Sequence, residues 1–195
     1  MGPNNDNYSS GVGHTIQVTA SSYDAFAMGF RTGATPYVFT ELQLPLLNLS
    51  GIDNLTISLR RDAGVGPGAV VETLSIDSPV FPDYPQPFSI TSLESTALPT
   101  LAANSVYWIT LEPTEIRSCW YSWSHLLSIP QPQILAFSDN PNANTPLPWS
   151  YSYAFQNGSA FAVYGNPVPE PSTLTILAVG GVLVLRCRRL RRLHR

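Results

Sequence analysis

Apolar and polar residues alternate along most of the chain between residues 14 and 165. In the stretch 53–60, for example, Leu55, Ile57 and Leu59 fall on one side of an extended backbone and polar residues fall on the other. Successive side chains of a strand point to opposite faces, so this period of two predicts strands with one buried face. We expect strands at 15–20, 23–30, 37–49, 53–60, 70–76, 88–93 and 105–111. Since helical spacing is absent before the C-terminal region, the pattern predicts an all-β fold, an antiparallel and jelly-roll-like β-sandwich over residues 14–165.

The same alternation predicts which side chains form the core. Phe26, Met28 and Phe30 recur at period two in the second strand, and Val38, Leu42, Leu44, Leu46 and Leu47 can be buried in the third. In the last strand Tyr107, Ile109 and Leu111 fall on one face, and Val106, Trp108 and Thr110 fall on the other. The run 62–68 is too rich in glycine for a strand and predicts a turn. Residues 1–13 are polar and rich in glycine and asparagine, which predicts a disordered N-terminal segment.

The C-terminal part of the chain follows a different pattern, with three segments in a fixed order. Residues 166–173 form a proline-rich linker, residues 174–185 form an almost unbroken apolar run, and residues 186–195 are rich in arginine. Prolines at alternate positions of the linker favour extended backbone, whereas the apolar run can satisfy its backbone groups in lipid as a helix. We therefore expect a transmembrane or sorting helix followed by a cytoplasmic tail.

The length of the apolar run and the charges that follow it indicate how the run would lie in a membrane. From Ser172 to Leu185 a helix spans about 21 Å, at about 1.5 Å per residue, whereas a bilayer core is about 30 Å thick. This short length favours a transient or processed membrane segment over a permanent span. A membrane-anchor stop is expected at the arginines, because positive charge is retained on the cytoplasmic side. Its residues are Arg186, Arg188, Arg189, Arg191 and Arg192.

This order of segments resembles a known sorting signal. Val168, Pro169, Glu170 and Pro171, followed by a short apolar helix and an arginine cluster, are similar to the PEP-CTERM sorting signal of Gram-negative bacteria that make exopolysaccharide. The resemblance implies recognition near the Pro-Glu-Pro tripeptide by an exosortase, a membrane cysteine protease-transpeptidase. It also implies an inner-membrane precursor, whose processed form reaches the cell surface or the extracellular matrix.

Short segments of the preceding domain resemble the choice-of-anchor extracellular domains that commonly precede this signal. The segments are 29–33, the Gly66-Pro67-Gly68 turn with the strand that follows it, and 101–108. The resemblance implies a β-sandwich of unassigned biochemical role and provides no catalytic residues.

Composition and the chain start narrow the class of protein. Through Pro171 the chain has four arginines against 13 acidic residues and no lysine, which excludes nucleic acid as a partner. Cys119 and Cys187 fall on opposite sides of the expected membrane, so no disulfide framework is expected. Residues 1–13 contain neither the basic region nor the apolar region of a signal peptide. We therefore expect a signal peptide encoded upstream of Met1.

Aromatic residues are the remaining candidates for binding. Trp120, Trp123 and Trp149 lie in segments where aromatic residues alternate with small polar ones. This pattern is compatible with a platform on which sugar rings stack and also with the inner face of a sandwich, which the pattern around Trp149 favours.

No set of residues predicts an active site. His14 and His125 are not accompanied by a nucleophile motif, and Asn140, Asn142 and Asn144 lack the glycine and the closing acid of a calcium loop. We therefore expect no catalytic residue, metal or cofactor. The sequence favours a non-enzymatic surface or matrix protein associated with exopolysaccharide and biofilm, and the alternative is a carbohydrate-binding module that uses exposed tryptophan and tyrosine residues.

Overall fold

The computed structural model describes residues 8–18, 23–50, 55–74, 89–114, 117–126, 134–140, 148–152 and 161–168. In chain order the strands are β1 (Tyr8–Val18), β2 (Tyr23–Arg31), β3 (Tyr37–Ser50), β4 (Leu55–Asp62), β5 (Pro67–Leu74), β6 (Ser89–Glu94), β7 (Thr100–Leu101), β8 (Val106–Pro113), β9 (Arg117–Leu126), β10 (Ile134–Asn140), β11 (Ser150–Ser152) and β12 (Ala162–Pro167). Paired strands run antiparallel, and the described ranges contain no helix. The structure therefore confirms the predicted all-β antiparallel fold for this part of the chain.

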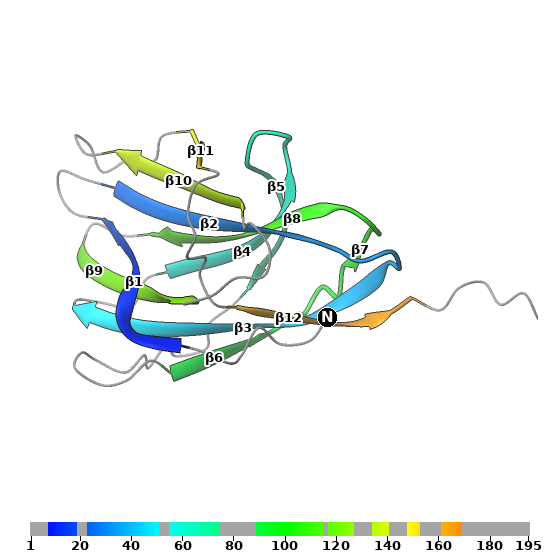
Figure 1. The fold of residues 1–195 in the computed structure, drawn as a ribbon, viewed down its shortest axis with the longest axis horizontal. Coiled ribbons are helices and arrows are strands. Elements are labelled where there is room, and N and C mark those ends of the chain that lie inside the picture. Colours follow the sequence, from blue (N-terminus) through cyan, green and yellow to red (C-terminus); the bar gives the residue numbers. More distant parts are fainter. Residues whose placement is uncertain are drawn as a thin grey trace, which may run out of the picture.

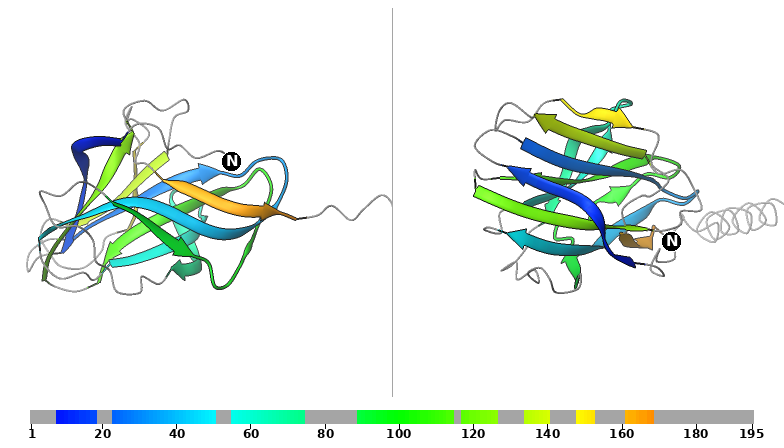
Figure 2. Two further views of the ribbon diagram at one scale, coloured as in Figure 1. Left: turned by 90° about the horizontal axis from the view of Figure 1, so that it is seen from below. Right: turned by 60° about the vertical axis from the view of Figure 1, so that its left-hand side comes forward.

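The strands join into one sheet that folds back on itself to give two layers (Figure 1). The first layer has the order β11-β10-β2-β8-β4-β5. In the second layer β1 pairs with β9, β9 pairs with β3, and β3 also pairs with β12, β6 and β7. A single pair, Gln17 opposite Asp24, joins the layers through β1 and β2. The right-hand view of Figure 2 shows β10, β2, β1, β9 and β3 following one another around this side of the molecule.

Apolar side chains from both layers meet in one core. The first layer contributes Phe26 and Met28 from β2, Ile57 and Leu59 from β4, and Tyr107, Ile109 and Leu111 from β8. The second contributes Phe39, Leu42, Leu44 and Leu46 from β3, Leu93 from β6, and Val163 from β12. Phe30 packs against this core and stacks on Tyr107 with ring centroids 6.1 Å apart. The predicted alternation in β2 and β8 is thus confirmed, and the structure shows that the face with Tyr107, Ile109 and Leu111 is the core face of β8.

A bulge in β3 changes which of its residues are buried. β12 pairs with Phe39 and Glu41 but leaves Thr40 between them as an extra residue. An extra residue reverses the alternation of faces, so Phe39 enters the core and Val38 is only half-buried. The prediction that Val38 belongs to the core is wrong for this reason. Leu42, Leu44 and Leu46 are buried as predicted, and the side chain of Leu47 lies outside the described residues.

The outer face of the first layer is also covered. Trp108 points away from the core, yet it is fully buried and clusters with Ala27 and Ala136 beneath the half-buried Trp149. The indole Nε1 of Trp108 donates a hydrogen bond of 2.8 Å to Oδ1 of Asp62. The period of two predicts the face on which Trp108 lies but not that this face is buried.

A buried carboxylate ties the first layer to the second. Glu72 lies on β5 opposite Leu59, and only 6% of its surface is exposed. Its side chain accepts hydrogen bonds from the Ser95 hydroxyl at 2.6 Å and from the backbone N–H groups of Thr96 at 2.8 Å and Ala97 at 2.9 Å. Ser95, Thr96 and Ala97 belong to the turn after β6, so Glu72 joins β5 of the first layer to the second layer.

These hydrogen bonds keep Glu72 charged and shape the turn. Burial acts against the carboxylate, but the donors on Ala97, Ser95 and Thr96 hold the pKa of Glu72 below its usual value. The Leu98 N–H donates to Oγ of Ser95 at 2.9 Å, and Leu98 has a φ of 48°. A left-handed leucine costs on the order of 1 kcal/mol, so the Glu72 network has to hold this turn in place.

The folded part begins and ends outside the range 14–165. β1 begins at Tyr8, within the segment 1–13 that was predicted to be disordered. Its pairing with β9 provides hydrogen-bond partners for the backbone, and composition alone cannot reveal such pairing. β12 continues to Pro167, within the proline-rich segment 166–173. A proline has no N–H to donate, but it is tolerated at the end of a strand.

Candidate functional site

Strand β12 carries the chain from the core to the segment that resembles a sorting signal. It pairs with β3 from Gln43 to Tyr37. Figure 1 and the left-hand view of Figure 2 show the two strands side by side. The pairing continues one residue beyond the strand, because the Val168 N–H donates a hydrogen bond of 3.0 Å to the Pro36 carbonyl oxygen. The folded part therefore holds the chain up to Val168, directly before Pro169.

Gly165 allows β12 to pass close to Tyr37. A Cβ atom at position 165 would collide with the ring of Tyr37 and with the carbonyl oxygen of Val38. The Tyr37 ring also packs against the core. Burial, together with the neighbouring Tyr107, raises the pKa of Tyr37 to about 12, and the phenol is therefore neutral at physiological pH. Among the described residues its buried hydroxyl has no hydrogen-bond partner.

Two connections meet at this end of the fold and fix each other. Thr32, after β2, donates its N–H to the Ser105 carbonyl at 2.9 Å and its hydroxyl to the Ala102 carbonyl at 2.6 Å. The Ser105 N–H returns a hydrogen bond of 2.8 Å to the Thr32 hydroxyl, and the Asn104 N–H donates to the Gly33 carbonyl at 2.8 Å. Both connections belong to the short motifs 29–33 and 101–108, whose resemblance to choice-of-anchor domains stays a prediction. These short motifs serve to build this end of the domain.

A pocket of about 330 Å³ lies between the β2–β3 connection and the end of β12. One wall consists of Gly33, Ala34, Thr35 and Tyr37, and the other of Val163, Gly165 and Pro167. None of these described lining residues carries a charge. The pocket therefore suits an uncharged group, and it shares Pro167 with the chain that leads to the sorting segment.

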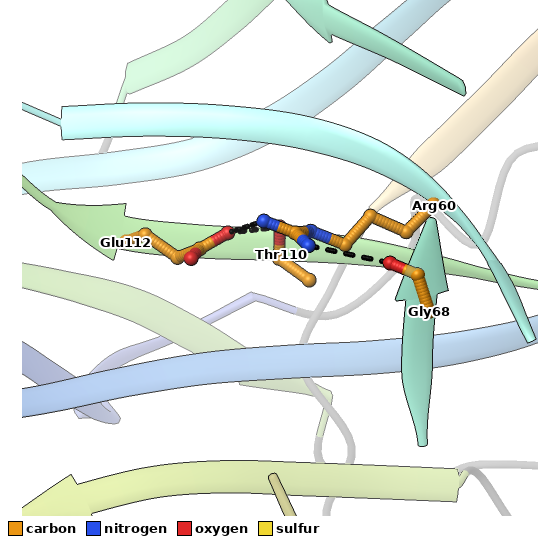
Figure 3. Close-up of polar contacts among 4 residues, drawn as sticks. All are labelled: Arg60, Gly68, Thr110 and Glu112. Carbon is orange, nitrogen blue, oxygen red and sulfur yellow. Dashed lines mark hydrogen bonds and ion pairs between the residues drawn. The ribbon is translucent and has the colours of Figure 1, made fainter. Parts of the chain in front are cut away.

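A polar cluster built around the ion pair of Arg60 and Glu112 lies on the outer face of the first layer (Figure 3). Arg60 donates from Nη2 to Oε1 of Glu112 at 2.7 Å, from Nε to the Thr110 hydroxyl at 3.2 Å, and from Nη1 to the Gly68 carbonyl at 3.3 Å. The Thr110 hydroxyl in turn donates to Oε1 of Glu112 at 2.9 Å. Burial, with Glu112 as the next cause, raises the pKa of the nearby Tyr23 above its ordinary value. The groups of this cluster satisfy one another, which favours a structural role.

Replacement of Arg60 by methionine tests that role. We expect the free energy of unfolding to fall by about 2 kcal/mol, between the values for exposed and buried ion pairs, because each side chain is 21% exposed. In the Arg60→Met/Glu112→Gln variant about half of this loss should be recovered, since no carboxylate is left unpaired. Urea unfolding of the wild type, Arg60→Met, Glu112→Gln and the double variant gives the coupling free energy between the two side chains. Strictly additive changes in the free energy of unfolding would contradict a paired cluster.

The structure describes some of the predicted site residues and not others. Val168 lies at the end of the fold, while Pro169, Glu170, Pro171 and the arginines Arg186, Arg188, Arg189, Arg191 and Arg192 lie outside the described residues. The backbones of Trp120 and Trp123 lie on β9, but their side chains are outside the described part. Trp149 is half-buried and packs against two clusters, one containing Tyr23 and the other Trp108. Stacking of sugars on these tryptophans remains a prediction.

Two further predictions concern membranes and metals. Within the described ranges, no helix has the length and apolar character needed to cross a membrane. The helix predicted at 174–185 lies outside those ranges. Among the same described residues, no three or more histidine, cysteine, aspartate or glutamate side chains are grouped so that they could hold a metal ion.

Sequence reasoning missed the residues that shape this end of the domain. Gly165 was not singled out, because a single glycine in the sequence does not indicate that the ring of Tyr37 packs on it in the folded protein. Tyr37 was expected only as the first residue of the strand at 37–49. A glycine two positions before the first proline of the linker was the available signal, and it is a weak one.

Comparison with known proteins identifies the C-terminal segment. The family model of the PEP-CTERM protein-sorting motif matches residues 167–192. Searches of curated proteins and of solved structures gave no match. The matched segment begins at Pro167, the last residue of β12. The chain thus carries a PEP-CTERM protein-sorting motif, which implies processing by an exosortase and passage of an exported protein through the membrane of a Gram-negative cell.

Proposed function

We propose that this protein is a non-enzymatic component of the cell surface or extracellular matrix that becomes associated with exopolysaccharide and biofilm. Its N-terminal part is a β-sandwich domain with a jelly-roll-like arrangement. A helix at 174–185 holds the precursor in the inner membrane, with the arginines on the cytoplasmic side. An exosortase then recognises Pro169-Glu170-Pro171 and separates the domain from the membrane segment.

The position of the motif relative to the fold carries this proposal. The matched segment begins at the last residue of β12, and Val168 is still tied to Pro36. Proline at alternate positions keeps the following backbone extended, in the form that a protease binds. Glu170 is the one acidic residue after Asp139 and provides a single charge three residues after Pro167.

The contacts of three carboxylates of the domain support a non-enzymatic role. Glu72 is fully engaged by the turn after β6, Asp62 accepts a hydrogen bond from Trp108, and Glu112 is paired with Arg60. General acid or base catalysis requires a carboxyl group that can reach a substrate. Each of these three carboxylates instead stabilises the fold.

Replacement of Glu170 by alanine in the native host tests the proposal. Loss of one charge-assisted contact, about 1.5 kcal/mol, should slow processing roughly tenfold, so that precursor accumulates. Pulse-chase labelling and blotting measure the ratio of precursor to mature protein.

The matched control is Glu94→Ala, which removes an exposed carboxylate of the domain and should leave processing unchanged. Normal processing of Glu170→Ala would count against recognition of the tripeptide. An unprocessed wild-type protein in a host with an exosortase would refute the proposed function itself.

A further inference from the structure

We propose that the pocket between the β2–β3 connection and β12 is a docking surface for the exosortase, which would contact the end of the folded domain as well as the Pro-Glu-Pro tripeptide. The occupant that we infer is an uncharged side chain of the enzyme on the outer side of the membrane. This inference rests on the proposed function, because it assumes that an exosortase binds the motif.

The pocket and the motif are continuous in space. Pro167 is both the first residue of the matched motif and part of the pocket wall. An extended chain covers at most about 3.6 Å per residue, so Glu170 lies within roughly 11 Å of Pro167. An enzyme that closes around Glu170 is therefore close enough to touch the pocket, since the chain between them has only two residues.

The walls of the pocket are held in place before any partner binds. The Gly33 carbonyl accepts the Asn104 N–H, the preceding Thr32 is fixed by Ser105, and the Val168 N–H is bonded to Pro36. Gly165 packs beneath the ring of Tyr37. A preformed surface costs little conformational entropy on binding, which makes it suitable for docking.

The lining determines the chemistry of the occupant. A volume of about 330 Å³ is near the lower limit for ligand pockets and holds one large side chain. The lining residues that the structure describes are small, apolar or hydroxyl-bearing, and none of them is charged. A lipid phosphate would require basic side chains or converging N–H donors. The lining therefore favours an apolar or aromatic side chain of a protein partner over a lipid headgroup.

The experiment fills the pocket without changing the motif. Position 33 accepts a larger residue, because a Cβ atom there meets nothing within 4 Å, and Gly33→Leu narrows the pocket. Thr35→Trp is a second variant from the same wall. Ala69→Leu, at an exposed site on β5 outside the pocket lining, is the matched control. Each full-length variant is expressed in the native host, its processing is followed by pulse-chase, and its thermal unfolding is compared with wild type.

We expect Gly33→Leu and Thr35→Trp to slow processing about tenfold, which corresponds to a loss of about 1.4 kcal/mol, while Ala69→Leu is processed normally. A pocket variant that unfolds at the wild-type temperature and is processed at the wild-type rate overturns the proposal. Faster processing also overturns it, because the pocket would then hold a segment of this chain that hides the motif. If one pocket variant fails to fold, the other decides the outcome.

Glu170→Ala in the same experiment separates the two proposals. Slow processing of Glu170→Ala together with normal processing of both pocket variants refutes the docking surface and leaves the proposed function intact. Normal processing of Glu170→Ala refutes recognition of the tripeptide. Slow processing of the pocket variants in that case would place recognition in the folded domain alone.

Discussion

Replacement of Glu72 by alanine is expected to lower the free energy of unfolding by about 3 kcal/mol, the largest effect that we predict for a polar residue of the domain. The carboxylate accepts hydrogen bonds from two hydroxyls and two backbone N–H groups of the turn after β6, the Thr96 hydroxyl being the most distant donor at 3.4 Å. Each hydrogen bond to a charged group contributes about 1.5–3 kcal/mol, and water can replace part of this at the exposed residues Thr96 and Ala97. The loss should lower the midpoint of thermal unfolding by roughly 6–12 °C.

Two variants separate the contributions of charge and contact. Glu72→Gln keeps the volume and one acceptor oxygen and should lose about half as much stability as Glu72→Ala. Glu94→Ala removes an exposed carboxylate and should change the free energy of unfolding by less than about 0.5 kcal/mol. Equal stability of Glu72→Ala and Glu94→Ala would show that the Glu72 carboxylate does not tie β5 to the turn.

The contribution of Glu72 should also depend on pH. Its pKa in the folded protein lies below the ordinary value of 4.5, so the folded state favours the charged form. The stabilisation is therefore complete well above pH 4.5 and is lost as the pH falls through the lower pKa of the folded state. The stability difference between wild type and Glu72→Gln should accordingly be constant from pH 6 to 8 and shrink below about pH 4.5. A difference that grows on acidification would contradict the pKa direction.

Replacement of Gly165 by alanine is expected to destabilise the protein by about 2 kcal/mol and to loosen the end of β12. The added Cβ would overlap with the Tyr37 ring and with the Val38 carbonyl oxygen. A ring can rotate, but a backbone carbonyl that belongs to a paired strand can move only if β3 and β12 separate locally. We expect hydrogen exchange at the Val168 N–H to accelerate, because its bond to the Pro36 carbonyl lies beyond the collision.

Gly33→Ala is the control for this substitution. A Cβ at position 33 meets nothing within 4 Å, so its stability should stay within about 0.5 kcal/mol of wild type. Equal free energies of unfolding for Gly165→Ala and Gly33→Ala would contradict the close approach of β12 to Tyr37. Urea unfolding and hydrogen exchange detected by mass spectrometry measure both quantities.

Much of the fold could be predicted from local pattern. The faces of β2, β4 and β8 follow from strict alternation, and the glycine-rich turn between β4 and β5 follows from composition, with Gly64 and Gly66 at positive φ. Alternation failed in β3, because the bulge at Thr40 depends on the register with β12, a strand more than a hundred residues away. It also could not show that the outer face beside Trp108 is covered.

The sorting motif could be predicted from the sequence because it is a linear signal. Alternate prolines, one acidic residue, an apolar run and terminal arginines act through composition and order. The pocket beside it could not be predicted, because its two walls come from residues 33–37 and 163–167, which only the antiparallel pairing of β3 and β12 brings together.

The sequence by itself therefore determined the all-β class, most of the core faces and the sorting motif, since each depends on neighbours along the chain. Only the tertiary structure decided how the two layers close, through Glu72 and the turn after β6, and where the motif leaves the fold, at Val168. The physical reason is that hydrogen bonds and close packing between distant segments depend on register. A shift of one residue in β3 exchanges Phe39 for Val38 in the core, and no local pattern determines that shift.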